Sequence, residues 1–325
     1  MAVIVLLGDI NIDLVLAIPA YPGEGGEAIA TGQTAMIGGS ATNTAIALAK
    51  AGHDCRLIGR VGIDSWGREA LSELAATGIS TRWIGRDDRE PTQINVITVS
   101  PTGERTMFAY RGANARLSAT DVDPAAFAGA ALFHLSGYAL LQPRQTEAAL
   151  TAIDLAVDAD IPVTLDIPGG VVAGIAAQVR ALLPRIDTIL LGSADLPGLL
   201  EQTEETDEEN LVAMLLKSGV RRVAVKGSGE PASRLHEIEK SASAPWFRVD
   251  VVDTIGAGDA FAAGHIHGRV TGLSAPDCCR LANAYGALAV TQKGAGTAMA
   301  GRDEVYAFIE KPERNLNRHS GEGSD

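Results

Sequence analysis

Short apolar runs alternate along much of the chain with longer amphipathic segments. Residues 3–7 (VIVLL) form such a run, and the run ends at Gly8, which predicts a buried strand. From about residue 130, further strands are predicted in ALFHLSG, IPVTLDI, TILLGS and RRVAVKG, with amphipathic helices between them. Strands that alternate with helices in this way favour a parallel sheet covered by helices on both faces.

Two segments follow a period of two instead. In GDINIDLVLAI, the polar residues Asp9, Asn11 and Asp13 alternate with apolar ones, so an extended chain places all three on one face. Within residues 92–110, TQINVITVS and ERTMFAY flank a Pro-Thr-Gly turn, which predicts a β-hairpin. We expect the hairpin and the 9–18 segment to form a small sheet apart from the main body.

The composition of the chain limits the classes of partner. The 325 residues are 46% hydrophobic and 21% charged, as in globular proteins, while aromatic residues are only 4%, which predicts a core of aliphatic side chains and small residues. The formal net charge of -13 repels nucleic acid phosphates and anionic membrane surfaces. We therefore expect neither nucleic acid nor membrane as a partner.

Cysteine usage and apolar run lengths predict the compartment. No run approaches the roughly 18–20 apolar residues that span a bilayer, and the opening segment lacks the basic start and small-residue cleavage site of a signal peptide. The three cysteines, Cys55, Cys278 and Cys279, are odd in number and have no metal-ligand spacing, which fits a reducing compartment. We expect a soluble cytoplasmic protein.

The segment DVVDTIGAGDAFAAGHIHG, residues 250–268, carries the strongest chemical signal. Gly256, Ala257 and Gly258 precede Asp259, and a helix of small residues follows. Small residues leave backbone N–H groups accessible, and a helix N-terminus adds partial positive charge, so the turn can hold an anion. An aspartate there can accept the proton of a hydroxyl that attacks phosphorus. The helix dipole should keep Asp259 ionised and weakly basic; an ordinary acidic residue at a glycine-rich helix start is the alternative.

Three motifs together resemble one family. DTIGAGDAFAAG resembles the C-terminal signature of the ribokinase-like (PfkB) carbohydrate kinases, GGSATNTAIALAKAG resembles their N-terminal signature, and GDINID resembles their sugar-binding strand. The resemblance runs from about residue 3 to 309. It implies a ribokinase-like three-layer α/β/α fold with a doubly wound, mainly parallel sheet and a small β-sheet lid. We expect one domain over 1–310, a lid from about 9–37 and 92–112, and a flexible tail at 311–325.

The resemblance also assigns roles to residues at the sugar. It implies that Asp259 is the catalytic base, and that Gly256, Ala257 and Gly258 form an anion hole for the transferring phosphoryl group. It implies sugar contacts from polar side chains and from a glycine pair where the backbone approaches the sugar: Asn11, Asp13, Gly38, Gly39 and Asn43. A solvated strand face is the alternative for Asn11 and Asp13, and a helix-capping amide is the alternative for Asn43.

For the nucleotide, the resemblance implies ATP with Mg²⁺, held by Lys226, Gly227, Gly229 and Asn283. Members often carry an N-x-x-E motif, but here Gly192 and Asp195 stand at its two positions, which leaves Asp195 to act on Mg²⁺ through water. Asp253 and the backbone of Ile255, with the loop 293–297, resemble a site for a monovalent cation such as K⁺.

These features predict an ATP-dependent sugar kinase that acts on a hydroxyl of an unphosphorylated small sugar, with a ribose-like pentose as the first expectation. Gln93 and Asn95 stand where relatives that act on phosphorylated sugars supply a basic residue, whereas Arg105 and Arg111 leave an anionic sugar acid open. The alternatives are a kinase of adenosine, inosine or pseudouridine, a 2-keto-3-deoxy sugar acid kinase, and a non-catalytic regulator that binds a sugar or nucleoside. We expect a homodimer through the lid, because exposed sheet edges pair.

Overall fold

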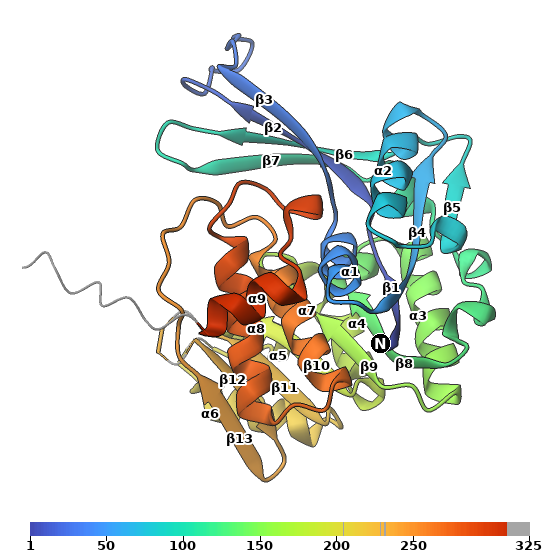
Figure 1. The fold of residues 1–325 in the computed structure, drawn as a ribbon, viewed down its shortest axis with the longest axis vertical. Coiled ribbons are helices and arrows are strands. Elements are labelled where there is room, and N and C mark those ends of the chain that lie inside the picture. Colours follow the sequence, from blue (N-terminus) through green and yellow to red (C-terminus); the bar gives the residue numbers. More distant parts are fainter. Residues whose placement is uncertain (204, 228, 231, 311–325) are drawn as a thin grey trace, which may run out of the picture.

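The computed structural model describes residues 1–310 except 204, 228 and 231, so the predicted tail at 311–325 lies outside the described residues. A nine-stranded sheet forms the body, in the order β13-β12-β11-β10-β9-β8-β1-β4-β5 (Figure 1). Its strands are β1 (Val3–Leu7), β4 (Asp54–Gly62), β5 (Ile84–Asp87), β8 (Ala130–Ser136), β9 (Val163–Asp166), β10 (Thr188–Gly192), β11 (Arg222–Lys226), β12 (Ser233–Glu237) and β13 (Lys240–Ala244).

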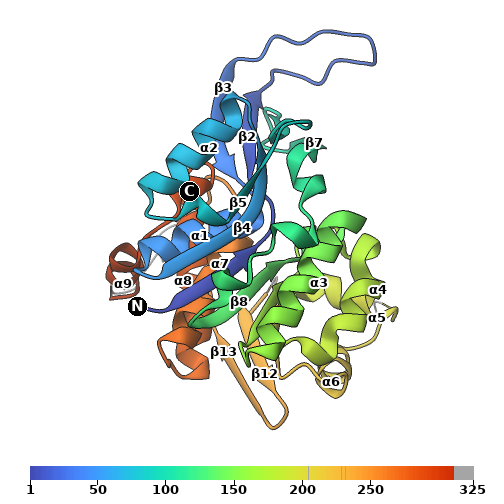
Figure 2. The same ribbon diagram turned by 90° about the vertical axis from the view of Figure 1, so that its right-hand side faces the viewer.

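Alternating side chains of β1 show why both faces of this sheet carry helices. Val5 and Leu7 enter the hydrophobic core on one face, whereas Ile4 and Leu6 enter the core on the other. Each face therefore needs an apolar cover, as in parallel sheets generally. Figure 2 shows the two helical layers on either side of the sheet. One layer contains α3 (Pro143–Asp158), α4 (Val172–Leu182), α5 (Leu196–Leu200) and α6 (Glu208–Lys217).

The other layer contains α1 (Ser40–Lys50), α2 (Ser65–Ala76), α7 (Ala257–Val270), α8 (Ala275–Ala289) and α9 (Arg302–Glu310). The small residues of α7 allow close approach to α8: a Cβ at Gly264 would lie 2.8 Å from the Cα of Ala282. The Ala- and Gly-rich composition therefore serves tight packing between these helices. In this layer His267 is buried and shares a 2.7 Å hydrogen bond with His53, so it serves the packing of these helices.

A separate four-stranded sheet stands above the body, with the order β3-β2-β6-β7 (Figure 1). It comprises β2 (Asn11–Ala17), β3 (Gly32–Gly38), β6 (Gln93–Val99) and β7 (Arg105–Tyr110). β6 and β7 pair as an antiparallel hairpin, and β6 runs parallel to β2, with Asn11 opposite Gln93 and Asp13 opposite Asn95. The predicted small sheet is confirmed, and this register places the polar residues of two strands side by side.

The two strands at the antiparallel edge of the large sheet were not predicted. β12 and β13 form a hairpin that pairs antiparallel with β11, so the sheet is mainly parallel, as the resemblance implies. The three cysteines are buried and free. Within the described part of the chain, no helix combines the length and apolar character needed to cross a membrane.

Candidate active site

The predicted site residues gather where the two sheets meet. β1 lies between β8 and β4, so the chain leaves the carboxyl end of β1 at a point where the strand order reverses. In open α/β sheets this reversal opens a crevice in which ligands bind. β2 continues from β1 into the lid, and β3 leads from the lid into α1 through Gly38 and Gly39. Both connections therefore carry polar residues directly into the crevice.

The GAGD turn forms the start of α7. Gly256 is the N-cap residue and adopts a left-handed conformation with φ 76°, which disfavours residues with a Cβ. A Cβ there would also lie 2.5 Å from the Cε of Met299. Ala257 and Gly258 occupy the first two helical positions, whose N–H groups have no acceptor within a helix. The turn thus has the backbone geometry that the predicted anion hole requires.

Asp259 joins the two signature motifs. Its Oδ2 accepts a 2.7 Å hydrogen bond from Nδ2 of Asn43, across 216 residues of sequence. The Oδ1 of Asn43 accepts a 2.9 Å bond from the backbone N–H of Gly296. Thr44 adds a 3.2 Å bond from its hydroxyl to the backbone carbonyl of Asp259. Asn43 therefore positions the carboxylate, which goes beyond the predicted sugar contact, and the helix-capping alternative does not describe it.

The electrostatic prediction for Asp259 was wrong in its direction. The helix dipole was expected to keep this carboxyl weakly basic, but burial raises its pKa to about 6, although Asn43 and Lys226 oppose the shift. Desolvation penalises the charged form more than the helix terminus and its hydrogen bonds favour it. Asp259 is consequently still ionised at pH 7 and is a stronger base than an ordinary aspartate, which suits proton abstraction.

At the lid side of the crevice, amide side chains hold one carboxylate. Oδ1 of Asp13 accepts bonds from Nδ2 of Asn11 at 2.7 Å and from Nδ2 of Asn95 at 2.8 Å. Gln93 donates to Asn95 at 3.0 Å, and Asn114 donates to Gln93 at 2.9 Å. Asn11 and Asp13 are only 2% and 5% exposed, so the solvated strand face is wrong. Burial also raises the pKa of Asp13.

The glycine pair makes room for this arrangement. A Cβ on Gly38 would lie 2.3 Å from Oδ2 of Asp13 and 2.8 Å from Nδ2 of Asn11. Gly39 has φ 106°, and a Cβ there would lie 2.2 Å from the carbonyl oxygen of Asp9. Glycine at these positions therefore lets the polar strand pack against the start of α1, in addition to the backbone approach that was predicted.

Asp9 has different hydrogen-bond partners from Asn11 and Asp13, the other polar residues of its segment. It precedes β2, and its carboxylate forms a bidentate pair with Arg111, at 2.6 and 3.0 Å. Gln145, a residue that sequence reasoning missed, donates to Asp9 at 2.8 Å and accepts from Arg111 at 2.7 Å. The positive charge of Arg111 is therefore matched by a buried carboxylate rather than left for an anionic sugar.

Tyr138 is a second residue that sequence reasoning missed. It follows β8, and its carbonyl accepts a 3.2 Å bond from Arg111. Burial raises the pKa of its hydroxyl, and the Asp259 and Asp9 carboxylates raise it further. The ring therefore lies within the electrostatic reach of both acidic groups of the crevice. Its only sequence signal is its place just beyond a predicted strand end.

A cavity of about 660 Å³ adjoins the GAGD turn. Of the residues predicted to hold ATP, Lys226, Gly227 and Asn283 line this cavity, whereas Gly229 is not among the lining residues. Asn283 donates from Nδ2 to the carbonyls of Ala244 and Pro245, at 3.1 and 2.9 Å. Further walls come from a segment that sequence reasoning missed, with Trp246, Phe247, Arg248, Val249 and Val251. An apolar, aromatic-lined cavity beside an anion-binding turn has the composition of a nucleotide site.

Charged side chains lie between the cavity and the turn. Nζ of Lys226 donates to Oδ1 of Asp166 at 2.8 Å, and a Cβ on Gly258 would lie 3.5 Å from the same Nζ. Burial raises the pKa of Asp195, while Lys226 and the backbone N–H groups of Gly170 and Gly192 lower it. Asp166 was missed, although an aspartate at the carboxyl end of a predicted strand is a usable signal. Asp166 and Asp195 are the carboxylates here that fit a water-mediated Mg²⁺ contact.

Asp253, predicted with Ile255 for a monovalent cation, accepts two backbone donors. Its Oδ1 accepts the N–H of Ile255 and its Oδ2 accepts the N–H of Gly294, each at 3.0 Å. Oδ1 also accepts a 3.1 Å bond from Arg105 of β7. Asp253 is thus bonded to the lid, to the loop 293–297 and to the residue that precedes the GAGD turn.

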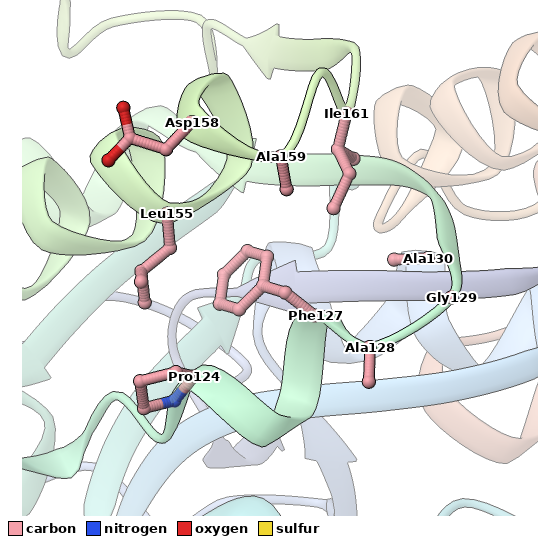
Figure 3. Close-up of a pocket in the computed structure, with 9 residues that line it drawn as sticks. All are labelled: Pro124, Phe127, Ala128, Gly129, Ala130, Leu155, Asp158, Ala159 and Ile161. Carbon is pink, nitrogen blue, oxygen red and sulfur yellow. The ribbon is translucent and has the colours of Figure 1, made fainter.

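A second cavity, of about 490 Å³, lies elsewhere (Figure 3). Phe127, Leu155 and Ile161 give it a largely apolar wall next to Gly129 and Ala130, at the amino end of β8. The crevice lies at the carboxyl ends of the strands, so this cavity is at the opposite edge of the sheet. None of the predicted site residues lines it.

The fold and the crevice together define a phosphotransferase with the ribokinase-like architecture. The family model for pfkB family carbohydrate kinases matches residues 1–300. The chain therefore belongs to the pfkB family of carbohydrate kinases, and it is an ATP-dependent sugar kinase with a hydroxyl acceptor.

Individual relatives agree with this assignment. An ATP-dependent ribose-1-phosphate kinase of Halopiger xanaduensis is 32% identical over 302 residues, which cover 93% of this chain and 96% of that protein. The structure of Arabidopsis thaliana ribokinase complexed with ribose and ATP has 27% identity and a TM-score of 0.83, covering 96% of this chain and 99% of that one. A protein from E. coli described as ribokinase II, solved with ATP and Mg²⁺, shares the fold at 23% identity, a TM-score of 0.85 and coverage of 95% and 99%.

Proposed function

We propose that this kinase transfers the γ-phosphoryl group of ATP to a hydroxyl of an unphosphorylated small sugar, with a ribose-like pentose as the first substrate. The observation that carries the proposal is the polar surface of the lid, where the amides of Asn11, Asn95 and Gln93 surround the Asp13 carboxylate. Neutral amides and one carboxylate match sugar hydroxyls, which both donate and accept. The two lid-side arginines, Arg105 and Arg111, are paired with carboxylates.

Asp259 takes the proton of the attacking hydroxyl, and Asn43 keeps its carboxylate oriented. The amides of residues 256–258 hold the charge on the transferring group. Lys226 adds a positive charge beside them, and Asp13 orients the sugar through the oxygen that faces Gly38. The adenosine of ATP occupies the cavity lined by Trp246. Mg²⁺ would neutralise phosphate charge when bound, and Asp195 and Asp166 are the residues that would hold it through water.

The assignment of the base is tested with Asp259→Asn. Loss of general base catalysis lowers kcat by about 10²–10⁴-fold, whereas sugar affinity by calorimetry stays within a few-fold of wild type. Near wild-type turnover in this variant would refute the assignment.

Substrate class is tested by measuring ADP release with a panel of compounds at equal concentration. Ribose and other free sugars should give the highest kcat/KM. A preference for ribose-1-phosphate, as the name of the 32% identical relative suggests, would contradict the unphosphorylated substrate. Nucleosides and 2-keto-3-deoxy sugar acids test the other two enzyme alternatives. Absence of turnover with every compound, together with tight sugar binding, would favour a non-catalytic regulator.

The lid also supports a homodimer. Every residue of the edge strand β7 is exposed, and Met107, Phe108 and Tyr110 are each more than half exposed. An apolar edge strand of this kind invites pairing with another sheet. Sedimentation should show a dimer that Phe108→Glu dissociates, and a wild-type monomer would refute it. The free, buried cysteines support a cytoplasmic location.

A further inference from the structure

The lid reaches the catalytic turn through one ion pair. Arg105 is the first residue of β7. Its Nη1 donates to Oδ1 of Asp253 at 3.1 Å, and the two residues are 148 positions apart in the sequence. The other terminal nitrogen of its guanidinium contacts the hydroxyl of Thr254. Both acceptors lie immediately before the turn at 256–258. A cation from the lid therefore sits at the base of the predicted anion hole.

The carboxylate of Asp253 has little remaining capacity for a metal ion. Both of its oxygens accept backbone N–H groups at 3.0 Å, from Ile255 and Gly294, and Oδ1 also accepts from Arg105. A K⁺ ion is held by oxygen atoms that replace its hydration shell. N–H donors directed at the carboxylate compete with such an ion for the same lone pairs. This donor set does not fit a monovalent cation.

We infer that the guanidinium of Arg105 supplies the positive charge that a monovalent cation was predicted to supply at Asp253, so the kinase works without K⁺. Arg105 is in this sense a positioning residue. It neutralises Asp253, whose uncompensated charge would oppose a phosphoryl group arriving at residues 256–258. A guanidinium suits the task because it is permanently charged and its planar fork contacts two acceptors.

Because Arg105 belongs to the lid, its neutralisation of the Asp253 charge depends on the position of the lid. The sugar-binding face of the lid belongs to the same sheet as β7. A lid that moved away from the body would withdraw the guanidinium from Asp253 and Thr254. The charge that favours phosphoryl transfer is thus complete only while the lid lies over the sugar, which restricts transfer to the closed site. The inference rests on the proposed role of the turn at 256–258.

The test compares cation dependence in wild type and variants. Initial rates are measured with Mg²⁺-ATP and the best sugar in choline chloride and in KCl at equal ionic strength. We expect wild-type rates in the two salts to agree within twofold. Arg105→Met should lose at least about tenfold in kcat/KM in choline chloride. Arg89→Met removes the same charge from an exposed position, at 76% side-chain exposure, and should behave as wild type.

Rescue separates charge from simple loss of structure. We expect tens of millimolar guanidinium chloride or KCl to restore Arg105→Ala several-fold while leaving wild type unchanged. Fivefold or greater activation of wild type by KCl overturns the inference. So does wild-type activity of Arg105→Met in choline chloride, or a loss that neither cation restores.

ATP binding distinguishes failure of this inference from failure of the proposed function. Trp246 lines the nucleotide cavity, so its fluorescence reports Mg²⁺-ATP binding without any sugar. Wild-type affinity should be the same in choline chloride and KCl, and Arg105→Met should bind more weakly. If ATP binds in this pattern while no sugar is phosphorylated, the proposed function fails and the inference holds. Potassium-dependent ATP binding by wild type overturns the inference, whatever the substrate.

Discussion

The hydrogen bond from Asn43 to Asp259 should set the acid limb of the pH–rate profile. Burial raises the pKa of Asp259 to about 6, and the bond from Asn43 opposes that rise because it stabilises the carboxylate. The protonated acid cannot accept a hydroxyl proton, so kcat/KM of the wild type should fall as the pH drops through about 6. Replacing Asn43 with Ala removes the donor and should move this fall to higher pH.

The size of the effect follows from the geometry. A hydrogen bond to a charged group contributes about 1.5–3 kcal/mol, and about 1.4 kcal/mol corresponds to a tenfold change in proton affinity. Water that enters the vacated space recovers part of this, so we take the lower end. The proton affinity of Asp259 should rise about tenfold, which moves the acid limb upward by about one pH unit. Asn43→Ala should therefore lose more activity at pH 6 than at pH 8.5.

The assay is direct chromatographic measurement of ADP between pH 5 and 9, with kcat/KM determined at each pH. Thr44→Val is the matched control, because Thr44 is the next residue of α1 and bonds only the backbone carbonyl of Asp259. Its acid limb should stay in place even if its rate changes. An unmoved limb in Asn43→Ala, or an equal movement in Thr44→Val, would refute the reasoning.

Two further outcomes follow from the geometry. Gly38→Ala places a Cβ 2.3 Å from Oδ2 of Asp13, so KM for the sugar should rise at least about tenfold with ATP affinity unchanged. Gly32→Ala on the same strand is the control, because the nearest atom to its new Cβ would be 3.8 Å away. An unchanged KM in Gly38→Ala would contradict this arrangement of the site. Burial lowers the pKa of His53 to about 4, and neighbouring positive charge adds to the shift, so the unfolded chain binds more protons and the free energy of unfolding should decline as the pH falls from 6.5 towards 4. Urea titration should show a loss of about 1–2 kcal/mol between pH 7.5 and 5 that His53→Gln reduces; an equal loss in both proteins would assign it elsewhere.

Much of the fold was predictable because its signals are local. The apolar runs that became β1, β8, β9, β10 and β11 are short and continuous, as strands buried on both faces are. The hairpin of β6 and β7 was marked by alternation around a Pro-Thr-Gly turn. β12 and β13 were not predicted because their sequences, SRLHE and KSASA, contain few apolar residues. The two strands join the sheet through the pairing of β12 with β11.

The site divides in the same way. Residues inside the motifs were predicted from the sequence, because each motif is contiguous and its small residues indicate a turn at a helix start. Asp166, Gln145 and Tyr138 lie outside any motif. Asp166 and Tyr138 have only the signal of their place at or just beyond a predicted strand end, and Gln145 has no local signal. The wall that contains Trp246 comes from an irregular segment, which carries no periodic signal.

The sequence by itself determined the class of chemistry, since three contiguous motifs, among them the glycine turn before Asp259, together resemble one family of kinases. Only the tertiary structure decided how each charged group is used. It paired Arg111 with Asp9, Lys226 with Asp166 and Arg105 with Asp253, and it raised the proton affinity of Asp259. The physical reason is that burial and partners distant in the chain set the free energy of ionising a side chain. Neither can be inferred from the residues next to it in the sequence.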